Sequence, residues 1–140
     1  MPGQLTIGLA ELDELESMAL AGYPLETCGL LLGVRTAHRV IVHKVRQARN
    51  VNTERAHDRF ELDPRDMLVA EMDARETDTE IVGIWHSHPD HPAEPSETDR
   101  QAAWEGWSYI ILSVTKKRVV DVRSWRLTSE KQFIEEELEQ

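Results

Sequence analysis

Residues 81–99 of the chain read IVGIWHSHPDHPAEPSETD, an apolar run that leads into three closely spaced histidines and then an acidic segment. Alternate residues of an extended strand point to the same side, so His86 and His88 can present two imidazoles to one metal ion. The proline that follows them is expected to end the strand and turn the chain. A helix beginning at Ser96 would then place Asp99 in its first turn, as a third candidate ligand.

Two imidazole nitrogens and one carboxylate oxygen form a donor set that suits zinc, which prefers four tetrahedral ligands. Three protein ligands leave the fourth position vacant, which is typical of catalytic rather than structural zinc sites. Each part also has a simpler explanation. A lone His-x-His pair is usually a surface coincidence, and Ser96 with Asp99 equally fits a helix capping box. The prediction of a metal site therefore depends on the combination.

The remainder of the chain predicts helices and strands in mixed order around this segment. We expect strands at 27–34, 39–45, 60–62, 81–85, 109–114 and 119–125, and helices at 11–22, from residue 63, at 96–106 and from residue 129 to the C-terminal end. In the second helix, Met67, Leu68 and Met72 are expected to form the buried side. This order indicates one domain over residues 1–140, of the α/β or α+β class, with a single mixed sheet flanked by helices.

Length and composition exclude several classes of protein. A chain of 140 residues is too short for a (β/α)₈ barrel, which needs about 250. The 16 lysines and arginines against 26 acidic residues give a net charge of −10, which argues against a nucleic-acid or anionic-membrane partner. A single cysteine excludes a disulfide framework. With neither a basic start typical of signal peptides nor a long apolar run, we expect a soluble, cytoplasmic protein.

Two other enzyme classes, the metallo-β-lactamases and the cysteine proteases, could also use the histidines of this segment. Residues 86–91 match the H-x-H-x-D-H pattern of the metallo-β-lactamase superfamily, but that fold takes further histidines from downstream, and no histidine follows His91. Asp90 and His91 are therefore expected to face solvent. A cysteine protease would need a histidine base beside Cys28. Because free cysteine is more often a buried packing residue, we expect that role for it, with redox inhibition of the site as the alternative. The other three histidines, His38, His43 and His57, are expected to be ordinary surface or strand residues, and the four tryptophans are expected in the core rather than at a substrate site.

The motif as a whole resembles the JAMM signature of the MPN-positive (Mov34/MPN/PAD-1) metalloproteases, of the small stand-alone prokaryotic type. In this chain the His-x-His-Pro part is residues 86–89 and the Ser-x-x-Asp part is residues 96–99. Residues 23–33 (YPLETCGLLLG) resemble the family's strand segment that carries a catalytic glutamate. Residues 60–64 (FELDP) resemble the short strand and helix start of its prokaryotic members. The likeness extends over about residues 5–125.

The resemblance implies an MPN/JAMM architecture, which is similar to that of cytidine deaminases, and one zinc ion per chain. It assigns His86, His88 and Asp99 as the zinc ligands. It also assigns Glu26 as the general acid/base and Ser96 as a group that helps to hold the water or the developing oxyanion. Spacing alone would not have selected Glu26 among 26 acidic residues.

The function implied by the resemblance is zinc-dependent hydrolysis by a peptidase or isopeptidase. The expected substrate is a ubiquitin-like β-grasp protein of the sulfur-carrier type, cut after its C-terminal Gly-Gly by zinc-activated water. The alternative is a non-catalytic MPN scaffold, a class that normally lacks one or more of the ligands. Every expected ligand position is filled here, which favours the enzyme. The sequence predicts neither the oligomeric state nor which ubiquitin-like protein is the partner.

Overall fold

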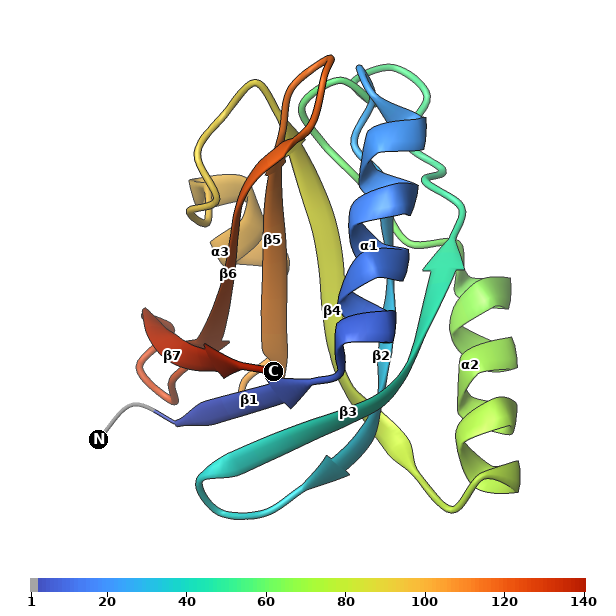
Figure 1. Cartoon of the computed structure of the whole chain (residues 1–140), viewed down its shortest axis with the longest axis vertical. Coiled ribbons are helices and arrows are strands. Elements are labelled where there is room, and N and C mark those ends of the chain that lie inside the picture. Colours follow the sequence, from blue (N-terminus) through green and yellow to red (C-terminus); the bar gives the residue numbers. More distant parts are fainter. Residues whose placement is uncertain (1–2) are drawn as a thin grey trace.

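Seven strands and three helices make up residues 3–140, the part of the chain that the computed structural model describes (Figure 1). The strands are β1 (Gln4–Ile7), β2 (Cys28–Arg35), β3 (Arg39–Ala48), β4 (Glu80–Pro89), β5 (Ser108–Val114), β6 (Val119–Leu127) and β7 (Phe133–Glu139). The helices are α1 (Leu9–Gly22), α2 (Pro64–Glu76) and α3 (Glu97–Ala102). The mixed order of helices and strands confirms the predicted α/β class.

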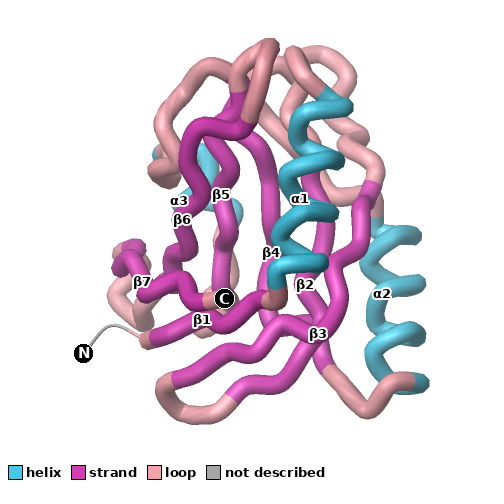
Figure 2. Tube along the Cα trace, viewed as in Figure 1, coloured by secondary structure: helices cyan, strands magenta, loops and turns pink. Residues whose placement is uncertain are grey.

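The strands form one sheet that curls until its edges meet (Figure 2). The order is β1-β3-β2-β4-β5-β6-β7, and β1 closes the barrel by pairing in parallel with both β3 and β7. Strands β4 and β5 are also parallel, whereas the remaining pairs are antiparallel. The prediction of a single mixed sheet flanked by helices is confirmed. The closure of that sheet into a seven-stranded barrel was not predicted.

Two hydrophobic clusters hold the long helices against the sheet. Leu15 and Ala19 of α1 pack in the larger cluster with Leu31 of β2 and other apolar strand residues. Ala70 and Ala74 of α2 pack in the second cluster with the neighbouring residues Leu30 and Leu32 of β2. Since adjacent strand residues point to opposite faces, the two helices lie on opposite faces of the sheet. No helix within residues 3–140 has the length and apolar character needed to cross a membrane.

Strand β4 is longer than predicted and carries the histidines inside its ladder. Its pairing with β5 continues from Gly83 to Pro89, so His86 and His88 lie within the regular strand, as the alternation argument for the two histidines requires. The backbones of β4 and β5 approach closely at Gly83, where a Cβ atom would lie 2.0 Å from the carbonyl oxygen of Ser108. Every residue from Val82 to Pro89 is buried or nearly so, which places the histidines in the interior.

Several predicted elements differ from the structure. The C-terminal segment is strand β7, not a helix, and the short strand β1 was missed. Residues 60–62 contribute only an isolated bridge from Leu62 to Asn50. The third helix ends at Ala102 rather than at residue 106. In α2, Leu68 and Met72 are exposed, since Ala70 and Ala74 form its buried side.

Candidate metal centre and adjoining cleft

Strand β4 presents two of the predicted metal ligands on the same face. His86 and His88 are both buried, and their Nε2 atoms lie 3.0 Å apart. The His86 ring stacks on the ring of Phe60, with centroids 4.5 Å apart. His88 Nδ1 donates a hydrogen bond to the carbonyl oxygen of Pro92 at 2.8 Å. Each imidazole is therefore held by a contact of its own, outside the pair.

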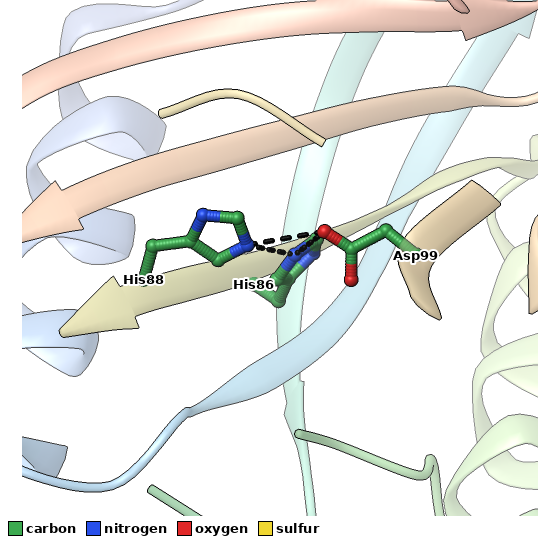
Figure 3. Close-up of side chains that lie close together, drawn as sticks. All are labelled: His86, His88 and Asp99. Carbon is green, nitrogen blue, oxygen red and sulfur yellow. Dashed lines mark hydrogen bonds and ion pairs between the residues drawn. The ribbon is translucent and has the colours of Figure 1, made fainter. Parts of the chain in front are cut away.

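Helix α3 brings the third predicted ligand to the same point (Figure 3). Asp99 Oδ2 lies 3.3 Å from His86 Nε2 and 3.1 Å from His88 Nε2. The same oxygen accepts a hydrogen bond from the Ser96 backbone N–H, and Ser96 Oγ accepts one from the Asp99 N–H. The capping box predicted as a simpler explanation is thus present, and it orients the carboxylate toward the histidines.

These three side chains form a centre that fits a zinc ion. Because the proton of His88 lies on Nδ1, a neutral His88 turns the lone pair of Nε2 toward Asp99 Oδ2. Two electron-rich atoms facing each other in a buried site require a positive charge between them. The three separations of 3.0, 3.3 and 3.1 Å are close to the edges, about 3.4 Å, of a tetrahedron with zinc–ligand bonds of about 2.1 Å.

The pKa values of the three groups also indicate that a positive charge is favoured between the two imidazoles and the carboxylate. Burial lowers the pKa of His86, and the charge of Asp99 acts in the opposite direction. Burial also disfavours the protonated form of His88, but the hydrogen bond and charge of Asp99 raise its pKa overall. Burial alone would raise the pKa of Asp99, yet the imidazoles and the Ser96 amide hold it well below its usual range. A divalent cation would supply the charge that a shared proton otherwise supplies.

Glu26 borders a cleft of about 380 Å³ that His88 also lines. Its side chain is buried, and Oε1 has no hydrogen-bond partner within residues 3–140. Burial raises the pKa of this carboxyl group to about 8, a shift that the charge of His88 opposes and the charges of Asp99 and Asp58 reinforce. A carboxyl group with a raised pKa and no protein partner is suited to exchange protons with a molecule in the cleft.

The chain around Glu26 is tied directly to the strand of the histidines. The Thr27 backbone N–H donates to Ser87 Oγ at 2.9 Å, and the Ser87 N–H donates to the Thr27 carbonyl oxygen at 2.9 Å. Ser87 lies between the two histidines and is fully buried. These contacts tie Thr27, the residue that follows Glu26, to the strand that carries both imidazoles.

Ser96 is exposed at the edge of the same cleft. Its oxygen accepts the Asp99 N–H at 3.0 Å, and this contact does not use the hydroxyl proton. The hydroxyl can therefore donate a hydrogen bond into the cleft while the oxygen caps the helix. The oxyanion role expected for Ser96 stays a prediction.

The segment of residues 50–61, which no sequence pattern tied to the site, contributes part of the cleft wall. Asp58 and Arg59 line the cleft, and Arg59 also borders a second cavity of about 260 Å³ with mainly apolar walls, which reaches Asp99. Phe60 covers the His86 ring, as described above. The resemblance of residues 60–64 to the family was the one sequence signal near this wall, and it pointed to no role for these side chains.

The residues to which no chemistry was assigned lie mostly as expected. Cys28 is buried with Sγ 3.9 Å from the Ala48 carbonyl oxygen, and burial raises its pKa to about 12, which confirms a packing role. Asp90 and His91 are exposed, and Asp90 accepts a hydrogen bond from the Tyr23 hydroxyl at 2.5 Å. The expectation for the tryptophans is wrong at Trp104, a residue that is 62% exposed.

The fold and the centre together define a single-sheet α/β protein whose central strand carries a His-x-His pair completed by an aspartate from the next helix. Comparison with known families gives the same class. Residues 10–128 match the family model described as prokaryotic homologs of the JAB domain. The chain belongs to this family.

Named relatives and a solved structure support that membership. The chain is 39% identical to a desampylase of Pyrococcus furiosus, over 79% of this chain and 72% of that protein. It is 36% identical to a desampylase of Haloferax volcanii over 64% of this chain, and spans 63% of that protein's length. It is 30% identical to the CysO-cysteine peptidase of Mycobacterium tuberculosis, over 75% of this chain and 70% of that protein. A solution structure of a Desulfitobacterium hafniense protein superimposes with a TM-score of 0.84 at 31% identity, covering 96% of this chain and 90% of that one.

Proposed function

We propose that the chain is a zinc-dependent hydrolase that cleaves ubiquitin-like protein conjugates after a C-terminal Gly-Gly. The observation that carries the proposal is the convergence of His86, His88 and Asp99 beside a cleft that Glu26 also lines. Relatives named as desampylases and as a CysO-cysteine peptidase support hydrolysis of such conjugates. Since no ligand position of the family signature is substituted, nothing favours the non-catalytic scaffold.

The residues of the centre and the cleft divide the chemistry among them. His86, His88 and Asp99 would hold the zinc ion, which when bound supplies Lewis-acid chemistry and lowers the pKa of water to about 7. Glu26 takes a proton from the attacking water and later delivers it to the leaving amine. The Ser96 hydroxyl donates a hydrogen bond to the oxygen that becomes negatively charged, a contribution of about 3 kcal/mol when such a donor is well placed.

Mass spectrometry of a folded ubiquitin-like protein extended beyond its Gly-Gly tests the proposal. The wild-type protein with zinc is expected to release the mature Gly-Gly end, and prior treatment with a chelator is expected to abolish cleavage. Glu26→Gln should keep zinc but lose activity by at least about a thousandfold, because it removes the proton carrier and no ligand.

Two results would contradict the proposal. If the purified protein binds no zinc at the three candidate ligands, the non-catalytic scaffold is the correct alternative. A Glu26→Gln variant with more than about a tenth of wild-type activity would mean that another carboxyl group carries the proton.

A further inference from the structure

Asn50 lies in the segment of residues 50–61, whose Asp58 and Arg59 line the cleft, and its side chain uses its whole hydrogen-bonding capacity. Nδ2 donates to the carbonyl oxygens of Glu26 at 3.2 Å and Arg59 at 3.0 Å. Oδ1 accepts from the backbone N–H groups of Asn52 and Glu61, both at 3.0 Å. A primary amide has two N–H donors and two acceptor lone pairs, so all four are occupied. Of the similarly sized side chains, only asparagine offers this combination.

Through these bonds Asn50 holds the residue proposed as the general acid/base. Glu26 precedes β2 and lies outside the sheet ladder, so the ladder does not fix its backbone. Its carbonyl oxygen accepts from Asn50, and its N–H donates to the Ala56 carbonyl oxygen at 2.6 Å. Both backbone polar groups of Glu26 are therefore bound to the segment of residues 50–61, which joins β3 to α2 (Figure 1).

The same amide fixes the segment that covers a metal ligand. Asn50 bonds to Arg59 and to Glu61, the residues on either side of Phe60. Phe60 is the residue whose ring stacks on His86. One side chain thus sets the position of Glu26 relative to the wall of the cleft and sets the wall relative to the metal centre.

We propose that Asn50 is a positioning residue, which holds the Glu26 backbone and the 50–61 wall so that the Glu26 carboxyl group faces the metal centre. This inference rests on the proposed function. Asn50 does not need to touch the substrate, because displacement of a catalytic group by about 1 Å can cost about a hundredfold in rate.

Asn50→Asp and Asn50→Ala test the inference in the full-length, zinc-loaded protein. Aspartate keeps the size and both acceptor contacts but loses the two donors, whereas alanine loses all four bonds. Both variants are expected to lower kcat by about tenfold to a hundredfold and to change KM much less, because the proposed role is in the proton-transfer step. Zinc content should change little, since neither substitution removes one of the three candidate ligands. Asn52→Ala is the matched control and should leave kcat unchanged. The Oδ1 atom of Asn52 accepts a hydrogen bond from the Arg55 N–H in the same segment and does not contact Glu26.

A double-mutant cycle separates positioning from general weakening of the fold. If Asn50 acts through Glu26, then Asn50→Asp should slow the residual reaction of Glu26→Gln far less than it slows the wild type. Hydrogen exchange adds a readout without substrate: the Glu26 amide should exchange faster in Asn50→Asp, while amides within β2 should not.

The outcomes distinguish this inference from the proposed function. Wild-type activity and its loss in Glu26→Gln report on the proposed function alone. Unchanged kcat in both Asn50 variants, unchanged exchange at Glu26, or independent effects in the cycle would overturn the positioning role. Failure of both variants to fold would also overturn it, since Asn50 would then be needed for the fold as a whole.

Discussion

Both ring nitrogens of His88 have a partner: Nδ1 bonds to the Pro92 carbonyl oxygen and Nε2 lies 3.1 Å from Asp99 Oδ2. His88→Ala removes one of three ligands at the end of a strand, so it should reduce zinc from one ion per chain to less than about a tenth, and leave the fold in place. Elemental analysis and circular dichroism measure the two effects. His91→Ala is the matched control. Since His91 is exposed and is not one of the three candidate ligands, this variant is expected to bind zinc like the wild type. Full zinc occupancy in His88→Ala would refute the ligand assignment.

Burial at the start of β2 should make the Cys28 thiol unreactive. The pKa of the thiol is raised to about 12, so the nucleophilic thiolate is negligible at neutral pH and increases only as the pH approaches that value. Native protein should therefore react with a thiol reagent many times more slowly than unfolded protein, and Cys28→Ser should keep its activity. Activity that requires Cys28 and resists a chelator would instead indicate a cysteine protease.

The convergence of the three candidate ligands could be predicted from the sequence, whereas the contact between Asn50 and Glu26 could not. His86, His88 and Asp99 form a local pattern, because strand alternation and a helix start determine which way they point. Asn50 lies 24 residues from Glu26 along the chain, and their contact depends on how β3 and the following segment pack. An asparagine at the end of a strand carries no signal of four hydrogen bonds that form only after folding.

At the scale of single elements, β7 shows why long-range partners decide the structure. Its Glu-rich sequence and a preceding Ser-x-x-Gln favour a helix by local preference. In the folded chain Glu136 is buried, accepts a hydrogen bond from the Ser124 hydroxyl at 2.8 Å, and pairs with Arg126 at 2.9 Å. Both partners lie on β6, and these contacts override the local preference for a helix.

A comparison of neighbouring glutamates tests the strand. Glu136→Ala leaves Arg126 without its buried partner and is expected to lower the free energy of unfolding by about 3 kcal/mol. Glu135 is exposed and lies 3.7 Å from Arg123, so Glu135→Ala should cost less than about 1 kcal/mol. Urea denaturation monitored by tryptophan fluorescence measures both changes. Equal effects of the two substitutions would contradict the burial of Glu136 in a strand.

For the whole molecule, the barrel depends on pairings between the two ends of the chain. Strand β1 pairs Leu5 with Val40 of β3 and with Leu138 of β7, which lies at the opposite end of the sequence. A four-residue strand gives a weak periodic signal, and nothing local indicates that it has two partners. The class of fold could therefore be predicted from the individual elements, but the closure of the sheet could not.

The size of the cleft, taken with the proposed function, predicts that substrate recognition extends to the folded body of the partner. The cleft and the adjoining apolar cavity have volumes of about 380 and 260 Å³, enough for a few residues of an extended tail. A free tail peptide buries little surface and loses conformational entropy when it straightens. A folded β-grasp protein that contacts the surface beside the cleft adds binding energy and holds the tail in line for attack. We therefore expect kcat/KM for a folded carrier–Gly-Gly–amino-acid conjugate to exceed that of its isolated tail peptide by at least about a hundredfold, as measured by mass spectrometry. Similar values for the two substrates would mean that only the tail is recognised and that the protein is a general metallopeptidase.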